Sequence, residues 1–315
     1  MAGSDGPVAV VQHPGGRWLG APAAFHGEGA FWDAAIGALR SVDMLRGDVL
    51  THREPGAADP GAAPAGGGDP VGDPAGGGER MRVGDVAALI RRRGAGGYVV
   101  ATERGFALLD DDLGLEREIP VFGDPGVRLN EGACDAAGRF YCGSMAYDCA
   151  PGAGKLYRLD PDLSVHVALE HVTIPNGLVW TDGGTVALHA DTADDAVYAY
   201  EFDPVAGTFG ERAVFVDFAG VPGSPDGMAL DVEGGLWVAM WGGGAVRRYD
   251  ARGILTDVVP LPVTNPTSCA IGGQAGTTLF VTTSRQGLVD RVEPHAGQVY
   301  AIDIGLAAAE VHAFG

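Results

Sequence analysis

A short phrase of apolar strands and polar turns recurs along this chain, and no other feature restricts the possible folds as strongly. The clearest copy, Ser224–Asp250, alternates three apolar runs with an Asp-rich turn and a Gly-rich turn. This pattern predicts an antiparallel meander of neighbouring strands. A repeat of short strands along a chain is typical of propellers and solenoids rather than of a single β-sandwich.

The second half of the phrase is a glycine, an apolar strand, a turn and a second strand that ends in an acidic residue. Its six copies are Gly37–Glu54, Gly97–Asp110, Gly138–Asp160, Gly184–Asp203, Gly234–Asp250 and Gly276–Asp303. Their spacing suits blades of four strands. The chain is therefore predicted to be an all-β, six-bladed β-propeller, with residues 1–315 forming one domain.

Two features concern the ends of the ring and its first blade. Val8–Gln12 and Glu310–Phe314 are β-prone runs, and pairing N-terminal and C-terminal strands in one blade would close the ring without open edges. We therefore expect these two runs to pair. The segment Pro55–Gly78 is low in complexity and has little to bury, so a flexible insertion is expected over about residues 55–80. Whether it acts as a lid is left open.

The charge and the N-terminus restrict the partners. Forty-one acidic against 21 basic residues give a formal charge of −20, which disfavours nucleic acid and anionic membranes. The N-terminus lacks a signal-peptide pattern, and no run of apolar residues is long enough to span a bilayer, so a cytoplasmic protein is expected, as a monomer or weak homo-oligomer. Free thiols are favoured over a Cys134–Cys142 bridge.

The first half of the phrase places an oxygen-bearing side chain at one repeated position. Aligning the copies puts Glu28, Asn130, Asn176 and Asp226 at equivalent points. Innermost strands line the central channel of a propeller, so these side chains are expected to meet. Glu131 competes with Asn130 for the position facing the channel, and the sequence does not decide between them.

Two carboxylates and two amide oxygens suit a hard divalent cation. So few protein ligands would leave positions open for water and substrate, which favours a catalytic site. Arg128, two residues before Asn130, could hold a polar substrate or its carboxylate product. His26, two residues before Glu28, could reach the site, but a solvated loop histidine is favoured. Arg91–Arg93 could bind an anion, but a solvated turn is favoured.

Five strings resemble the gluconolactonase, regucalcin and luciferin-regenerating-enzyme family of six-bladed propellers. They are GEGAFWD, RLNEGACDAAGRFYCGSM, PNGLVW, SPDGMALDVEGGLWVAMWGGGAVRRYD and PTSCAIGG. The resemblance implies that Glu28, Asn176 and Asp226 hold a divalent metal. It also implies that Arg128, Asn130 and Asp148 contact the substrate. The chain departs from the family pattern at Leu39–Asp43, where charged and polar residues replace aromatic ones, and at Asp148, where regucalcin carries the longer Glu.

Together these features predict a metal-dependent hydrolase that opens a small polar, sugar-type lactone. Asp226 would activate the attacking water while ligating the metal, and Asn130 would donate a hydrogen bond to the developing oxyanion. Ca²⁺ is the expected ion, with Zn²⁺, Mg²⁺ and Mn²⁺ as alternatives. A phosphotriesterase-like hydrolase and a non-catalytic calcium-binding propeller remain open. Asp231 is expected to cap a turn, so that its replacement changes stability only slightly.

Overall fold

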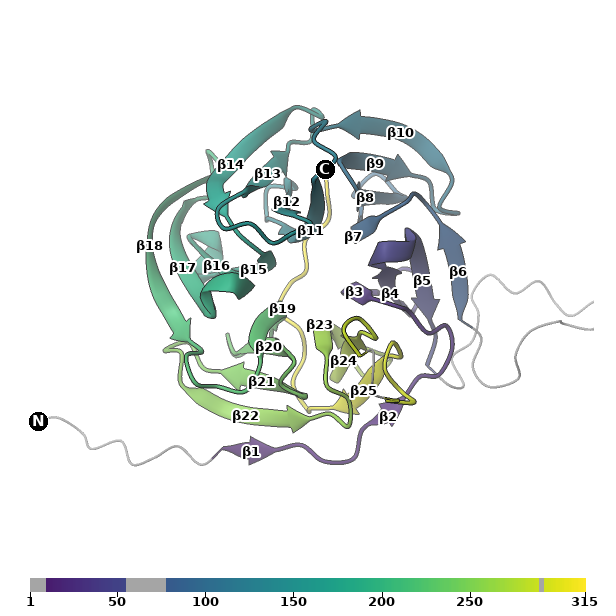
Figure 1. The fold of residues 1–315 in the computed structure, drawn as a ribbon, viewed down its shortest axis with the longest axis vertical. Coiled ribbons are helices and arrows are strands. Elements are labelled where there is room, and N and C mark those ends of the chain that lie inside the picture. The colour runs from purple at the N-terminus through teal and green to yellow at the C-terminus, as the bar shows by residue number, and fades with distance from the viewer. Residues whose placement is uncertain (1–9, 55–77, 289–291) are drawn as a thin grey trace, which may run out of the picture.

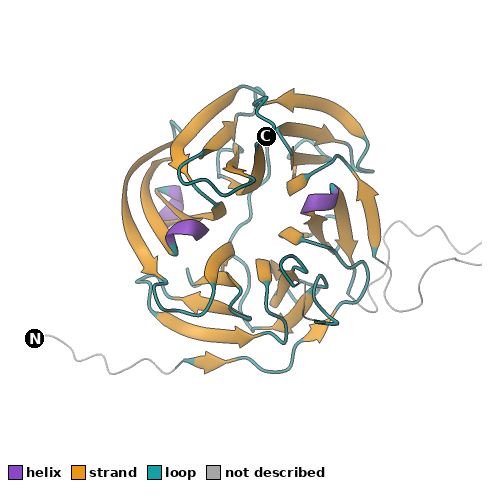
Figure 2. Ribbon diagram, in the orientation of Figure 1, coloured by secondary structure: helices purple, strands orange, loops and turns teal. Residues whose placement is uncertain are grey.

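The computed structural model describes residues 10–54, 78–288 and 292–315, whose strands form six sheets arranged in a ring (Figure 1). Figure 2 shows that strands and loops make up nearly all of the ring. Within the described ranges, the helices are three single 3-10 turns: η1 (Met44–Arg46), η2 (Asp182–Gly184) and η3 (Thr192–Asp194). The predicted six-bladed β-propeller is therefore confirmed.

Each blade contains an antiparallel set of four strands, and the first strand after each inter-blade connection lies innermost (Figure 1). The first two blades contain β3 (Gly27–Asp33), β4 (Ala38–Asp43), β5 (Asp48–His52) and β6 (Glu79–Arg82), then β7 (Ala87–Arg92), β8 (Tyr98–Thr102), β9 (Gly105–Leu109) and β10 (Leu115–Pro120). The next two contain β11 (Val127–Cys134), β12 (Phe140–Ala146), β13 (Gly154–Leu159) and β14 (Val165–Val172), then β15 (Pro175–Thr181), β16 (Val186–Asp191), β17 (Ala196–Asp203) and β18 (Thr208–Asp217). The last two contain β19 (Ser224–Leu230), β20 (Leu236–Trp241), β21 (Ala245–Tyr249) and β22 (Leu255–Pro260), then β23 (Pro266–Gly272), β24 (Thr278–Thr283), β25 (Tyr300–Asp303) and β2 (Arg17–Trp18).

All six copies of the repeated phrase fall on the two middle strands of a blade. Gly97–Asp110, for example, contains β8 and β9, and Gly234–Asp250 contains β20 and β21. β8 and β20, for example, are almost completely buried, so their sequences are short continuous apolar runs between glycine-containing turns. This local pattern is what made the blades visible in the sequence.

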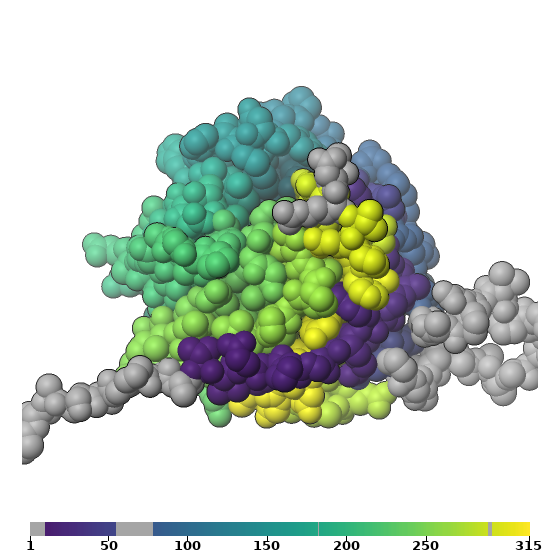
Figure 3. Space-filling view, turned by 60° about the horizontal axis from the view of Figure 1, so that its bottom comes forward, coloured from purple at the N-terminus to yellow at the C-terminus, as the bar shows by residue number. Residues whose placement is uncertain are grey.

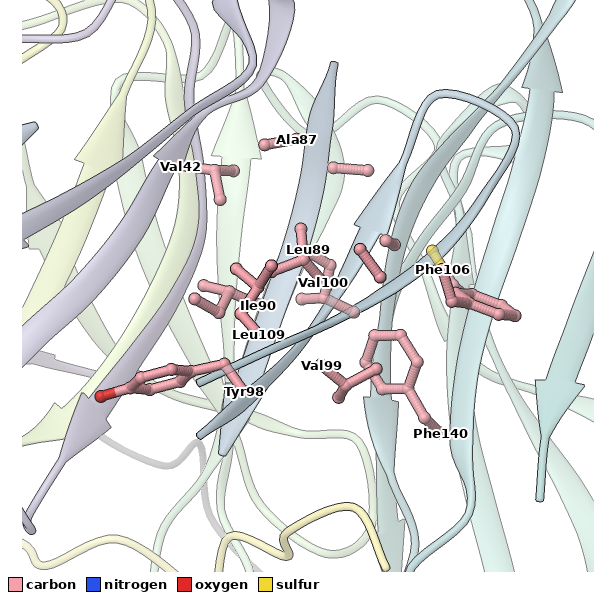
Figure 4. Packing of buried hydrophobic residues seen from close by; sticks show 14 of the residues in the cluster. Val42, Ala87, Leu89, Ile90, Tyr98, Val99, Val100, Phe106, Leu109 and Phe140 are labelled. Atoms are coloured by element: carbon pink, nitrogen blue, oxygen red, sulfur yellow. The ribbon is translucent and has the colours of Figure 1, made fainter. Parts of the chain in front are cut away.

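The blade cores are continuous from one blade to the next. In Figure 4, Leu89, Ile90 and Val100 of the second blade pack between Val42 of the first blade and Phe140 of the third. Tyr98 belongs to the same cluster, and its hydroxyl points toward the first blade. Packing between blades, rather than within a single sheet, therefore supplies much of the apolar burial.

The polar residues of β4 find partners at this junction between the first two blades. Arg40 donates to Thr51 and, over 3.3 Å, to the Tyr98 hydroxyl, which donates in turn to Asp33 over 2.7 Å. Ser41 Oγ lies 2.9 Å from His52 Nε2. A hydrogen-bonded network thus replaces the aromatic packing that the family pattern would place in this strand.

The ring closes through N-terminal and C-terminal strands, as predicted, but not through the predicted runs. β2 pairs antiparallel with β25, and Trp18 stacks on His295 with ring centroids 4.9 Å apart. The run ending at Gln12 was assigned to the wrong blade, because β1 (Val11–Gln12) pairs in parallel with β22 of the fifth blade. Figure 3 shows this N-terminal segment, in purple, lying along the outside of the ring. Residues 8 and 9 lie outside the described ranges.

The expectation that Glu310–Phe314 pairs within the last blade is wrong. The segment after β25 crosses the central channel, as the yellow trace in Figure 1 shows. Its backbone bonds to Leu230 of the fifth blade, Arg92 of the second and Gly138 of the third. Phe314 is buried in the cluster formed by the second and third blades. Covering apolar side chains at the channel end therefore takes precedence over adding another strand to a blade.

These contacts predict different losses of stability for two N-terminal truncations. Removal of residues 1–12 takes away the short parallel pairing of β1, so we expect the free energy of unfolding to fall by only about 1 kcal/mol. Removal of residues 1–19 also deletes β2 and Trp18, and we expect a loss of at least about 3 kcal/mol. Urea unfolding of the two truncated proteins measures the difference. Equal losses would contradict closure through β2.

The expected insertion lies between β5 and β6, the outer two strands of the first blade, where Thr51 pairs with Glu79. Residues 55–77 lie outside the described ranges, and residues 79–80 belong to β6, so the predicted boundary at 80 was too late.

All four cysteines are free thiols, and Cys134 and Cys142 are both buried. No helix in the described part of the chain is both long and apolar enough to cross a membrane.

Candidate metal centre in the channel

Three buried carboxylates meet in the central channel, each from the innermost strand of a different blade. Glu28 comes from β3, Glu131 from β11 and Asp226 from β19, and they offer oxygens that lie within 4.8 Å of one another. Their residues are only 3%, 3% and 4% exposed. One oxygen of each, Oε2 of both glutamates and Oδ1 of Asp226, has no hydrogen-bond partner among the described residues. Unpartnered, buried carboxylate oxygens are suitable ligands for a cation.

The electrostatics of this cluster also favour a bound cation. Burial raises the pKa of Glu28 well above its usual value, and the charges of Asp226 and Glu131 raise it further. Burial followed by the charge of Glu131 likewise raises the pKa of Asp226. Like charges at such distances cannot all ionise without a counter-charge. A divalent cation supplies that counter-charge, and an all-oxygen donor set suits hard cations.

A β-bulge that recurs in the inner strands brings these side chains together. The pairing of β11 with β12 slips between Leu129 and Gly132, so that Asn130 and Glu131 lie in a bulge. The same slip occurs in β15 at Asn176–Gly177 and in β19 at Asp226–Gly227, and in β3 it directly follows Glu28. An extra residue interrupts the alternation of side chains. Asn130 and Glu131 can therefore both take part in the site.

The two amides form a second group. Asn130 Nδ2 donates to Asn176 Oδ1 over 3.2 Å and to the carbonyl of Pro175 over 2.8 Å, so both amide hydrogens are used. Asn130 Oδ1 accepts from Arg128 Nη1 over 2.6 Å. Asn176 Nδ2 donates to Thr192 Oγ1 over 2.6 Å. Asn130 thus connects Arg128 to Asn176, whose carbonyl oxygen still has a free lone pair.

Arg128 and its surroundings form the rim of the site. Its guanidinium is buried and donates to the Leu129 carbonyl over 3.0 Å and contacts Met44 Sδ at 3.1 Å. It also lies over the Tyr147 ring, 5.9 Å from the centroid. Burial lowers the pKa of Arg128 from its usual value. Asp148, next to Tyr147, is exposed, and its carboxylate accepts from the Ala150 backbone over 3.1 Å.

His26 and Arg91 were expected in solvent, and both expectations are wrong. His26 Nδ1 lies 2.8 Å from Ser284 Oγ, and Nε2 lies 3.7 Å from Glu28 Oε1. Burial, and then the charge of Arg128, lower the pKa of His26 to about 3, so the ring is neutral. Arg91 is buried and donates to the carbonyls of Gly29 and Gly132, which ties neighbouring inner strands together.

The channel also contains a cavity of about 100 Å³ whose lining is more apolar than polar. All six innermost strands contribute residues, such as Phe31, Leu178 and Ile271, and Arg91 of β7 is a charged residue in the wall. Ala308–His312 of the C-terminal segment closes one end. Glu28, Glu131 and Asp226 do not belong to the lining of this cavity, so the carboxylate cluster occupies a different part of the channel.

Sequence reasoning identified Glu28, Asp226, Asn130, Asn176 and Arg128, and the structure brings them together as two adjoining groups. Sequence reasoning left the orientation of Glu131 undecided, because a strict alternation of side chains admits only one of two consecutive residues into the channel. A comparison with the inner strand of the sixth blade could have indicated that Glu131 also faces the channel. Ser268 of PTSCAIGG occupies the bulge of β23, and its hydroxyl donates to Glu131 Oε1 over 3.3 Å. Aligning all the inner strands would have placed the two opposite each other.

Comparisons with known proteins identify the family to which the whole chain is similar. Residues 26–285 match the family described as the SMP-30/Gluconolactonase/LRE-like region. Regucalcin of Oryctolagus cuniculus is 34% identical over 288 residues, which cover 88% of this chain and 90% of that protein. Regucalcin of Danio rerio is 33% identical over 234 residues, covering 71% and 78%.

Two solved structures are similar throughout. A luciferin-regenerating enzyme superimposes with a TM-score of 0.80 at 25% identity and covers 93% of this chain and 96% of its own. A calcium-binding protein, regucalcin, from Agrobacterium tumefaciens gives 0.81 at 24% identity over 97% and 98%, which shows a shared fold. The matched range contains every carboxylate of the cluster. The chain therefore belongs to the SMP-30/gluconolactonase/LRE-like family.

Proposed function

We propose that this protein is a metal-dependent hydrolase that opens small polar, sugar-type lactones. The observation that carries the proposal is the set of three buried carboxylates with unpartnered oxygens, beside the buried guanidinium of Arg128. Such a site combines a cation position, a proton acceptor and a donor for an anionic oxygen. The family includes gluconolactonases, which supports this reaction class.

Glu28, Asn176 and Asp226 would hold the cation, and we expect Ca²⁺. All three side chains are buried, and each comes from the innermost strand of a different blade. Relatives named regucalcin and the calcium-binding regucalcin structure support the choice of ion. When bound, a divalent cation polarises a carbonyl and acidifies a water.

Side chains of the protein would then accept the proton, stabilise the oxyanion and contact the substrate. Asp226 accepts a proton from the attacking water, whose oxygen bonds to the lactone carbonyl carbon. The ring C–O bond breaks, and the proton passes to the ring oxygen, which leaves a hydroxy acid. Because Asn130 uses both amide hydrogens within the protein, we assign the hydrogen bond to the developing oxyanion to Arg128 and a positioning role to Asn130. Asp148 would contact the substrate from the rim.

Arg128→Lys tests this division. Lysine keeps the charge but lacks the planar guanidinium, in which Nη1 donates to both Asn130 and the Leu129 carbonyl and which can bind an anionic oxygen through more than one nitrogen. We expect kcat/KM for polar lactones to fall by roughly 10²–10³-fold, as for loss of an oxyanion donor. Metal affinity, measured by calorimetry, should change little. Unchanged kinetics would place Arg128 outside the site.

A panel of lactones assayed by proton release, with and without a chelator, tests the function itself. The proposal predicts turnover of sugar-type lactones that the chelator abolishes and added Ca²⁺ restores. A phosphotriester in the same panel tests the alternative hydrolase. Metal binding without turnover of any member would instead identify a calcium-binding propeller, and turnover that survives chelation would exclude a metal-dependent reaction.

A further inference from the structure

The third carboxylate of the cluster has no role in the proposed reaction. We propose that Glu131 is a direct ligand of the cation, so that this chain holds its metal with three carboxylates and Asn176. This inference rests on the metal site of the proposed function, but not on the identity of the substrate. It predicts a more anionic site, with a stronger preference for hard cations, than Glu28, Asn176 and Asp226 would form alone.

The position of Glu131 is unusual within the ring. It is the second residue of the bulge in β11, a position held by Gly177 in β15, Gly227 in β19 and the small polar Ser268 in β23. A Cβ atom at Gly177 would lie 2.5 Å from Met228 Cγ, and one at Gly227 would lie 2.6 Å from Ser268 Oγ. Those two bulges therefore exclude a side chain. The third blade instead sends a long acidic side chain into the channel from this position.

Contacts fix one end of the Glu131 carboxylate and leave the other open. Oε1 accepts from Ser268 Oγ of the sixth blade over 3.3 Å. Oε2 is buried and has no hydrogen-bond partner in the described part of the chain. The carboxylate oxygens of Glu131, Glu28 and Asp226 lie within 4.8 Å of one another. An ion with the usual calcium–oxygen distance of about 2.3–2.6 Å can contact oxygens with this separation.

The nearby arginines do not neutralise Glu131 by direct pairing. The Nη atoms of Arg91 donate to the backbone carbonyls of Gly29, Ile90 and Gly132. Arg128 Nη1 donates to Asn130, on the rim side of the cluster. A carboxylate that is 3% exposed and lacks a paired cation is costly. A bound metal relieves that cost for Glu131 as it does for Glu28 and Asp226.

The test measures metal binding rather than turnover. Metal-stripped wild type, Glu131→Gln and Glu131→Asp are titrated with Ca²⁺ by calorimetry, and Tb³⁺ luminescence lifetimes in H₂O and D₂O count the waters on the ion. Loss of a direct ligand should weaken Ca²⁺ binding by about 100-fold or more, beyond the 10–100-fold typical of outer partners. In both variants about one additional water should replace the lost oxygen on Tb³⁺.

Ser268→Ala is the matched control, because it removes the hydrogen bond to Oε1 but no carboxylate, so its affinity should fall by no more than the 10–100-fold typical of an outer partner and its Tb³⁺ should gain no water. Glu131→Asp separates contact from charge: it keeps the charge and shortens the reach, so full affinity in this variant would overturn the proposal. Equal affinity and equal hydration in Glu131→Gln would also overturn it, as would a wild type that binds neither ion. The predicted losses would support Glu131 as a ligand even if no lactone were turned over, an outcome that defeats only the hydrolase.

Discussion

Asp226→Asn is expected to lower lactone turnover by about 10²–10⁴-fold, the usual contribution of a general base. The substitution is nearly isosteric, so the fold should persist. Asp226 Oδ1 is buried without a hydrogen-bond partner among the described residues, which leaves it available to a water or a metal. Metal affinity should fall as well, since one carboxylate ligand is lost. Saturating metal should refill the site without restoring the rate, because an amide does not accept the proton of the water.

Proton-release kinetics across a range of Ca²⁺ concentrations measure this effect. Asp217→Asn serves as control, because Asp217 is an exposed carboxylate at the end of β18 whose side chain accepts a turn hydrogen bond from the Ala219 backbone. It should match the wild type at every concentration. Full activity of Asp226→Asn at saturating metal would reduce Asp226 to a replaceable ligand, and would transfer the base to Glu28 or Glu131.

The second large effect concerns stability. Asp231→Ala is expected to cost about 3–5 kcal/mol of unfolding free energy, as for removal of one partner from a buried ion pair. Asp231 is 1% exposed and accepts from Arg248 Nε over 2.6 Å and from Trp237 Nε1 over 2.8 Å. It also caps its turn by accepting from the Gly235 backbone, as expected. The sequence indicated the turn but not Arg248 across the sheet, so the large loss expected here replaces the slight change predicted from the sequence.

This stabilisation should depend on pH in a defined direction. Burial alone raises the pKa of Asp231, but the hydrogen bonds from Arg248, Gly235 and Trp237 outweigh burial and lower the pKa below its usual value. The folded state therefore favours the ionised form. Its contribution is present above the unfolded pKa of about 3.9 and is lost as the pH falls through the lower folded value.

Urea unfolding at pH 7 and near pH 3 measures both effects. The gap between wild type and Asp231→Ala should be large at pH 7 and smaller in acid, while kcat at pH 7 and a permissive temperature stays close to the wild-type value. Asp217→Ala should stay within about 0.5 kcal/mol at both pH values. An unchanged stability of Asp231→Ala would show that the ion pair with Arg248 contributes nothing.

The architecture could be predicted because each blade repeats one local pattern. Residues such as those of Gly234–Asp250 specify two strands and a turn by themselves, without reference to the rest of the ring. The two ends could not be predicted in the same way. Whether Phe314 joins a blade or covers the channel depends on apolar surface contributed by the second and third blades, which no local pattern records.

The site residues also fall into those that a local pattern predicts and those whose position depends on neighbouring blades. Glu28 and Asp226 could be found because their positions recur in the repeat. Glu131 could not be settled, because the bulge in β11 breaks the alternation from which orientation is inferred. Arg91 and His26 were misplaced because their burial results from neighbouring blades, and a charged or imidazole side chain carries no local sign of such burial.

The most direct test titrates metal-stripped protein with Ca²⁺ while proton release from a sugar-type lactone is followed. If one cation in the carboxylate cluster enables ring opening, activity should be absent at first, rise with added Ca²⁺ and reach its plateau at one equivalent when the protein concentration is far above Kd. Full activity of the stripped protein, or no activity with Ca²⁺ bound, would contradict this function for the site.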